Sequence, residues 1–189
     1  MSIFIQAHQD VFWGNSKSNK TYHFALTATP SHAISVDVVA SIQGDTLQLS
    51  YFIENSFSMD TSNKPTLMRC DFLWEKTCLE CFFDFGQRAY IELNFTPTGA
   101  FNLYHFDDYR TPNTLPPRWA NGTVFAITGT PLDTHHVYHV GVKLDNTAHM
   151  DICTISPTAI LYQDNTPYFY AIKHANPPDF HDKSFWQKL

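Results

Sequence analysis

The sequence predicts an all-β protein, an antiparallel β-sandwich of the jelly-roll type with about nine or ten strands. Three observations lead to this fold class. Aromatic residues make up 15% of the chain, with 16 Phe and 9 Tyr, and aromatic side chains favour strands. Short runs of alternating apolar and polar residues recur at the spacing of a sandwich or barrel. No amphipathic stretch is long enough to be a major helix.

The size and charge of the chain bound its class. Its 189 residues and hydrophobic content of 43% fit one domain over residues 1–189 with a sizeable core. A net charge of -6 argues against nucleic-acid partners, which need a basic surface, and against an anionic membrane surface. The N-terminal MSIFIQAHQDVFWGNS lacks the features of a secretory signal. We therefore expect a soluble, cytoplasmic protein.

The first half of the chain contains a strand and a hairpin. Residues 22–29 form the first predicted strand. Residues 34–42 and 46–54 both alternate, and Gln43-Gly44-Asp45 lies between them as a turn. The polar residues 55–64 predict a loop.

The second half contains more short runs of the same kind. Residues 79–84, 90–95 and 101–106 predict neighbouring strands, and the three prolines of residues 107–121 exclude regular structure for most of that stretch. Beyond it the sequence predicts strands at 123–128, 137–144 and 150–155, a short turn of helix at 156–161 and a last strand at 168–174.

Four cysteines, Cys70, Cys78, Cys81 and Cys153, include one C-x-x-C pair. On a strand, positions three apart point to opposite faces, so this pair does not present two thiols to one metal. We expect buried free thiols, typical of a reducing compartment.

Polar side chains on the central strands form the leading candidate site. Side chains two apart on a strand share a face, so Glu80 faces one way on its strand, and Glu92 and Asn94 share a face of the next. Aromatic and planar polar groups are the types that bind sugars. The full set is Trp74, Glu75, Glu80, Glu92, Asn94 and Arg110. The alternative is a solvated sheet face with one Glu–Arg pair.

Two carboxylates on adjacent strands also permit a glycoside-processing enzyme. Glycosidases need two carboxyl groups roughly 5 to 9.5 Å apart, and Glu80 and Glu92 could meet that spacing. This enzymatic hypothesis stays beside the binding hypothesis.

The C-terminal stretch HANPPDFH, with His174, Asp179 and His181, is a second candidate. It would form a metal site, a loop that closes over the polar sheet face, or a lock in which Asp179 caps a turn or pairs with Arg110. Another histidine group, His135, His136 and His139, is only a weak metal candidate. For a b-type haem, Met59, Met68 and Met150 are available, but their spacing selects no pair.

Three linked motifs carry a family resemblance: LWEKTCLECFF, YIELNFTPTGAFNLYHFDDYR and YFYAIKHANPPDFH. Together they resemble the bacterial DOMON-like domains, which are related to family 9 carbohydrate-binding modules. The resemblance implies a jelly-roll β-sandwich that binds a sugar or haem. Trp74, Glu80 and Asn94 match the family's sugar-binding pattern.

The chain also departs from that pattern. Glu92 stands where family 9 modules can have a sugar-contacting Arg. The second stacking aromatic is left open between Trp186, Phe180 and His174. For calcium the acidic candidates are Asp107 and Asp108, and the haem-binding relatives would imply His174 or Lys173 with Met68.

We interpret the chain as a small-molecule binding module without catalysis, with a sugar as the ligand. Trp74 would stack on the sugar, Glu80 and Glu92 would accept hydroxyl hydrogen bonds, and Arg110 would orient or neutralise the acids. No cofactor is expected, with haem or calcium as the alternatives, and the oligomeric state is left open. The predicted ligand-binding set is Trp74, Glu75, Glu80, Glu92, Asn94, Arg110, His174, Asp179 and His181.

Overall fold

The computed structural model describes residues 20–57, 59, 65–145 and 151–189, and the all-β class is confirmed. Helical structure in these residues is limited to two 3-10 turns, η1 (Leu73–Glu75) and η2 (Lys183–Phe185). The strands are β1 (Lys20–Thr29), β2 (Val36–Gln43), β3 (Thr46–Glu54), β4 (Met68–Arg69), β5 (Cys78–Asp84), β6 (Tyr90–Phe95), β7 (Ala100–Phe106), β8 (Gly122–Pro131), β9 (His135–Leu144), β10 (Thr154–Gln163), β11 (Thr166–Ala171) and β12 (Gln187–Lys188).

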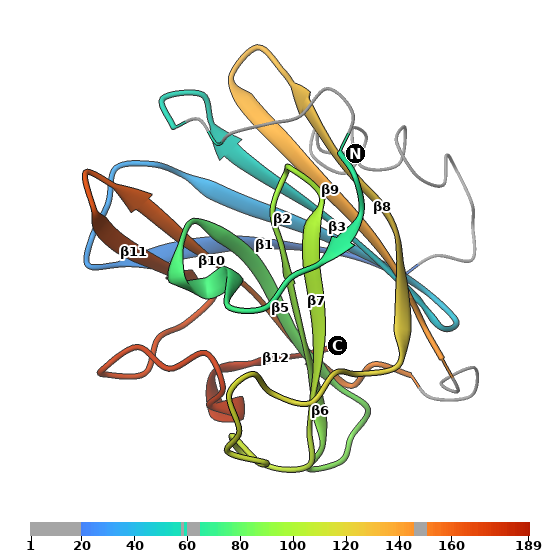
Figure 1. The fold of residues 1–189 in the computed structure, drawn as a ribbon. Coiled ribbons are helices and arrows are strands. Elements are labelled where there is room, and N and C mark those ends of the chain that lie inside the picture. Colours follow the sequence, from blue (N-terminus) through green and yellow to red (C-terminus); the bar gives the residue numbers. More distant parts are fainter. Residues whose placement is uncertain (1–19, 58, 60–64, 146–150) are drawn as a thin grey trace.

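The strands follow one continuous path of pairing. Its order is β4-β7-β6-β5-β10-β11-β1-β2-β3-β9-β8, with β12 attached to β10. Its two halves are joined where β1 pairs with β11 over only three residue pairs. The halves face each other across the core, with the strands β5 to β7 opposite β1 to β3 (Figure 1). Because this joint makes one curled sheet, the predicted sandwich with nine or ten strands is not confirmed.

The core lies between the two halves, on the face that we call the inner face. Alternate residues of each strand point into it, as the period of two in a strand requires. Val38, Leu49 and Val140 come from one half, and Phe83 and Leu93 from the other, and all five are buried. This shared apolar burial is the main driving force that holds the halves together.

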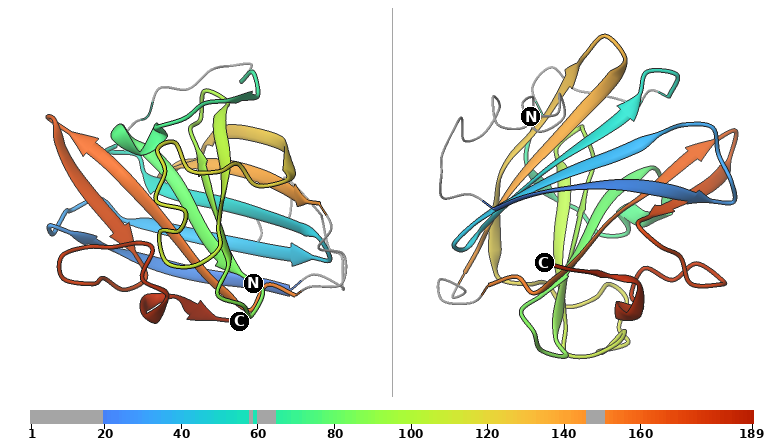
Figure 2. Two further views of the ribbon diagram at one scale, coloured as in Figure 1. Left: turned by 60° about the horizontal axis from the view of Figure 1, so that its bottom comes forward. Right: turned by 180° about the vertical axis from the view of Figure 1, so that it is seen from behind.

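The opposite face of β5, β6 and β7, which we call the outer face, is also buried. It carries polar residues such as Glu80, Asn94 and Asn102. A second cluster there includes Phe82, Tyr104 and Trp186. Residues 107–121 and the C-terminal segment, residues 172–186, flank this face (Figure 2). The outer face is therefore covered by chain and is not a solvated sheet surface.

The predicted hairpin is confirmed by the pairing of β2 with β3 over Val36–Ile53 to Gln43–Thr46. The predicted helical turn at residues 156–161 is wrong, because these residues lie within β10. Proline has no backbone N–H to donate to a neighbouring strand. On one flank of β10, Pro157 lies between the part that pairs with β12 and the part that pairs with β11, so no strand on that flank needs a hydrogen bond from it. Met150, at the start of the predicted strand 150–155, lies outside the described residues.

All four cysteines are free. Cys78 and Cys81 are buried and point to opposite faces of β5, since Cys81 belongs to the main core and Cys78 does not. Burial of these two thiols is confirmed. Cys153 is exposed, which contradicts the prediction for that residue, because it lies just before β10 begins.

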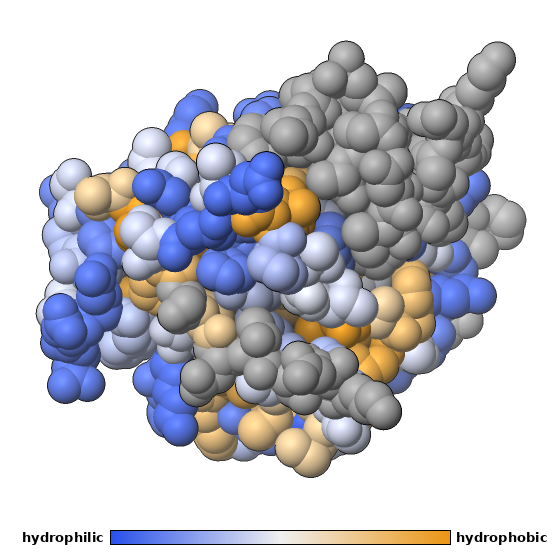
Figure 3. Space-filling model, turned by 90° about the horizontal axis from the view of Figure 1, so that it is seen from above, coloured by the Kyte–Doolittle hydropathy of each residue, from blue (hydrophilic) through white to orange (hydrophobic). Residues whose placement is uncertain are grey.

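The surface seen from above mixes hydrophilic and hydrophobic residues, and the hydrophobic ones form separate patches (Figure 3). In the part of the chain that the structure describes, there is no helix with the length and apolarity that a membrane span requires.

The turn between β6 and β7 predicts a stability effect. Gly99 has φ +100°, and a Cβ there would lie 2.4 Å from the carbonyl oxygen of Thr66. Gly99→Ala should therefore lower the free energy of unfolding by at least about 2 kcal/mol, as measured by urea denaturation. Gly44→Ala is the control, because Gly44 has φ +57° but open space, and it should cost only about 1 kcal/mol. Equal losses would contradict the close approach at Gly99.

Candidate functional site

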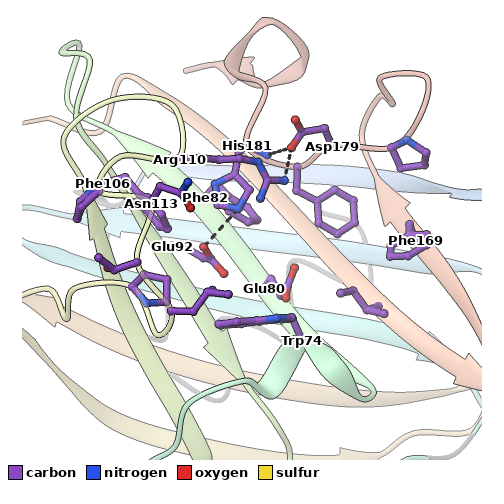
Figure 4. A pocket seen from close by; sticks show the side chains of 17 residues that line it. Trp74, Glu80, Phe82, Glu92, Phe106, Arg110, Asn113, Phe169, Asp179 and His181 are labelled. Atoms are coloured by element: carbon purple, nitrogen blue, oxygen red, sulfur yellow. Dashed lines mark hydrogen bonds and ion pairs between the residues drawn. The ribbon is translucent and has the colours of Figure 1, made fainter.

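A cavity of about 280 Å³ opens on the outer face of β5 and β6. Glu80 and Glu92 lie in it, Trp74 lies on one side, and Arg110 with Asp179 lies on the other (Figure 4). Its lining comes from the sheet, the η1 turn, the 107–121 loop and the C-terminal segment: Trp74, Glu80, Phe82, Glu92, Phe106, Arg110, Pro112, Asn113, Thr114, Leu115, Pro117, Ile160, Phe169, Pro178, Asp179, Phe180 and His181.

The strand register brings the two glutamates together. Glu80 pairs with Asn94, and Phe82 pairs with Glu92. Glu80 and Glu92 are therefore diagonal neighbours on one face, at a separation typically about 7–8 Å. Both are almost completely buried, at 2% and 4% exposure.

The η1 turn places Trp74 at the edge of this face. The turn follows Phe72, whose backbone is left-handed with φ 61°. The indole ring packs edge-on against Phe72 at 5.4 Å and against Tyr104 at 5.6 Å between ring centroids. Two aromatic neighbours fix the ring, so Trp74 forms a rigid, half-buried wall of the cavity.

A tight turn carries Arg110 into the opposite wall. Its φ of 46° is uncommon for a residue with a side chain, and its amide donates to the hydroxyl of Tyr90 at 3.1 Å. The guanidinium donates from Nη2 to Asp179 Oδ1 at 2.8 Å. The hydroxyl of Tyr109 donates to Asp179 Oδ2 at 2.5 Å. These bonds join the 107–121 loop to the C-terminal segment.

His181 connects this junction to Glu92. The Tyr90 hydroxyl accepts the Arg110 amide and lies 2.7 Å from His181 Nδ1. The other ring nitrogen, Nε2, faces Glu92 Oε2 at 3.7 Å. Burial, together with the charge of Arg110, lowers the pKa of His181 to about 3. His181 is therefore neutral at physiological pH.

Burial also raises the pKa values of the two glutamates. It raises the pKa of Glu92 to about 7, against the opposing effects of the Asn94 hydrogen bond and the Arg110 charge. Burial, with the added charge of Glu92, raises the pKa of Glu80 well above its ordinary value. Near neutral pH the pair therefore retains at least one proton, and the cavity offers both a carboxyl donor and carboxylate acceptors.

The structure brings together six of the nine predicted ligand-binding residues in the cavity lining: Trp74, Glu80, Glu92, Arg110, Asp179 and His181. The other three are outside the lining. Glu75 is exposed. Asn94 holds Glu92, since its Nδ2 donates to Glu92 Oε1 at 2.8 Å, and His174 donates from Nε2 to the carbonyl of Thr27 at 2.7 Å. Ligand binding by the whole set stays a prediction.

Several lining residues were not predicted from the sequence. They include Phe82, Phe106, Phe169 and Leu115. The first three lie on strands that were predicted, and Phe82 even shares a face with Glu80 by alternation. Leu115 comes from the proline-rich loop, and the signal that could have found it is that this loop follows Arg110 directly.

Two of the ligand pairs proposed for the alternative cofactors lie within the described residues. Met68 lies on β4 and His174 follows β11, five positions apart in the strand order, which is on the order of 20 Å along the sheet. They therefore do not form an axial pair. Asp107 and Asp108 pair with Arg118 and Arg88. Among the described residues no three His, Cys, Asp or Glu side chains come together as a metal site.

Comparison with known proteins gives a likeness of fold. No protein family model matches the chain, and no curated protein matches it. A crystal structure of a "putative carbohydrate-binding protein" from Bacteroides uniformis is similar, with a TM-score of 0.56 and 13% sequence identity over 90% of this chain and 85% of that chain. At this identity the likeness establishes a shared fold.

The raised pKa of Glu92 predicts a pH-dependent cost to stability. An unfolded Glu ionises near its ordinary pKa, so between about pH 5 and 7 the folded chain binds more protons than the unfolded chain, and its stability falls as the pH rises. Glu92→Gln removes this loss. At pH 8 the variant should exceed the parent protein in free energy of unfolding by on the order of 2–3 kcal/mol, and at pH 4.5 the two should be nearly equal.

Urea denaturation at the two pH values measures this difference, in which titrating groups distant from Glu92 largely cancel. Removal of the Glu92 charge also relieves Glu80, which adds to the gain at pH 8 in the same direction. Glu75→Gln is the matched control, because its side chain is exposed, and its difference from the parent should not change with pH. A Glu92→Gln difference that is also constant would contradict the raised pKa.

Proposed function

We propose that this protein binds a carbohydrate in the cavity between Trp74 and the Arg110–Asp179 pair, without catalysis. The observation that carries the proposal is the combination of an aromatic wall with two carboxyl groups that open into one cavity. Apolar surface with a few fixed polar groups is the general design of small-molecule sites. The name of the Bacteroides uniformis protein with the similar fold supports the same class of ligand.

The roles of the residues follow from their chemistry. Trp74 would cover the C–H surface of a sugar ring, because its own ring is fixed by Phe72 and Tyr104. Glu92 would accept hydroxyl hydrogen bonds and a protonated Glu80 would donate one. Arg110 and Asp179 would hold the wall and present polar edges to the ligand.

The size of the cavity limits the length of the ligand. At about 280 Å³ it lies just below the usual range of small-molecule sites, about 300–1,000 Å³. It therefore suits a monosaccharide, or the end unit of a short oligosaccharide, better than a long stretch of polymer.

Removal of Trp74 should weaken sugar binding strongly and leave the fold intact. Trp74 is only half buried, so Trp74→Ala should retain the far-UV circular dichroism of the parent. It should raise the dissociation constant for a bound sugar at least tenfold, a loss of about 1.4 kcal/mol in binding free energy. A glycan array first selects the sugar, and calorimetry then measures the affinity. Phe125→Ala is the control, because Phe125 is 44% exposed on β8 at the far end of the strand order. Equal affinities of Trp74→Ala and the parent would refute this site.

A second candidate function is glycoside hydrolysis by Glu80 and Glu92. The raised pKa values of the pair favour it, because such an enzyme needs one protonated and one ionised carboxyl group. If this function holds, the protein should release nitrophenol from an aryl glycoside and Glu80→Gln should reduce the rate at least a hundredfold. Binding of the sugar without release of nitrophenol would exclude it for that glycoside.

A further inference from the structure

The two glutamates in the cavity lack a positive partner. In the part of the chain that the structure describes, no Lys or Arg nitrogen lies within 4.0 Å of either carboxyl group, and the histidine nearest to Glu92 is neutral. The one guanidinium in the lining belongs to Arg110, whose described ion pair is with Asp179. The cavity lining therefore has more acidic side chains, Glu80, Glu92 and Asp179, than basic ones able to pair with them.

This arrangement differs from that of four aspartates around the site, which each have a cationic partner: Asp84 pairs with Lys183, Asp107 with Arg118, Asp108 with Arg88, and Asp179 with Arg110. Asp71 is instead held by three neutral donors, from Asn102, Tyr104 and Trp119. Three of the four paired aspartates have side chains that are more exposed than those of the glutamates, yet each has a cation, whereas the buried glutamates have none. Because a buried carboxylate without a partner is costly, a ligand that supplies the positive charge would gain the most from this position.

The walls around the glutamates also suit a cation. Trp74, Phe82, Phe169 and Phe180 line the same cavity. The faces of aromatic rings attract ammonium groups, most strongly when water is excluded. Phe180 and Phe82 pack together, with ring centroids 6.2 Å apart, so part of this aromatic wall is continuous.

We propose that the ligand is an amino sugar with a free, protonated amino group, and that this group lies between the carboxyl groups of Glu80 and Glu92. The inference rests on the proposed carbohydrate-binding function and names the class of sugar. A neutral sugar would leave the carboxyl pair protonated. An N-acetylated sugar would place a carbonyl oxygen or an uncharged amide against it, and would add volume to a small cavity.

Binding of an ammonium group is expected to release a proton. The free pair retains at least one proton near neutral pH, and an ammonium ion favours the ionised form of both acids. The other titratable groups that face the pair are Arg110, Asp179, His181, Tyr90, Tyr104 and Cys78. Arg110 and Asp179 remain charged in their ion pair. His181 remains neutral because its pKa is lowered, and Tyr90, Tyr104 and Cys78 because burial raises theirs. The released proton therefore comes from Glu80 or Glu92.

The experiment compares sugars that differ only in the group at one carbon. Glucosamine, N-acetylglucosamine and glucose form one matched set, and galactosamine, N-acetylgalactosamine and galactose form another. Each is titrated into the protein at pH 6.5, as the monosaccharide and, for the first set, as the β-1,4-linked disaccharide. We expect an amino sugar to bind at least tenfold more tightly than its neutral counterparts. The binding enthalpy should also vary with the ionisation enthalpy of the buffer, as proton release requires.

The variants assign the preference to the glutamates. Glu80→Gln and Glu92→Gln should each remove most of the preference for the amino sugar, whereas Glu75→Gln, with its carboxamide outside the cavity, should retain it. Trp74→Ala should lower the affinity for amino sugars and for neutral sugars by the same factor.

Two results would overturn the inference, and they are distinguishable. If neutral or N-acetylated sugars bind as tightly as amino sugars, the amino group is not recognised, but carbohydrate binding stands. If none of the sugars binds, the amino-sugar inference and the proposed function fail together.

Discussion

The junction between Arg110 and Asp179 determines how the outer face of the sheet is used. It joins the 107–121 loop to the C-terminal segment, and both lie beside the outer face of β5, β6 and β7. Without that cover, strand alternation would leave Glu80 and Glu92 on a wet surface, where carboxylates ionise normally. With it, the same side chains are buried, and their pKa values rise. The raised pKa values in the cavity therefore depend on the covering segments as much as on the strands that carry the glutamates.

A single ion pair is too weak to hold such a cover. The side chains of Arg110 and Asp179 are 52% and 22% exposed, and exposed pairs contribute at most about 1 kcal/mol. The remaining stabilisation comes from apolar packing and neutral hydrogen bonds. Trp186, the last residue of the C-terminal segment, packs against Phe82 and Tyr90, and the neutral His181 bonds to Tyr90. The ion pair sets the alignment, and the aromatic cluster supplies most of the burial.

The sequence predicted well which residues form strands and which side chains share a face of a strand. It predicted poorly whether each face is buried or exposed to solvent. Alternation is local, so it placed Glu80 on one face of its strand and Glu92 with Asn94 on one face of the next. Whether that face is wet depends on segments far along the chain with no periodic pattern, such as the proline-rich loop after Arg110. For the same reason Phe169 and Leu115 were missed as lining. Pro157 misled the prediction at residues 156–161, because its tolerance within β10 depends on where β11 and β12 begin to pair.

The polar residues of the cavity fall into two groups, those that close the fold and those that do not. Arg110 and Asp179 satisfy each other, and His181 is held by Tyr90, so these side chains are explained by the closure of the fold. Among the described residues, Glu80 forms no hydrogen bond or ion pair with these closing residues, and Glu92 meets only the neutral ring of His181, at 3.7 Å. Apolar residues of similar size would fill their places at lower cost to stability, since buried acids must give up hydration or their charge. Two buried carboxyl groups that face one cavity make the fold less stable than apolar residues would. Residues that lower stability in this way concentrate at functional sites. The carboxyl pair, more than the arginine that closes over it, is thus where the function of this cavity is to be sought.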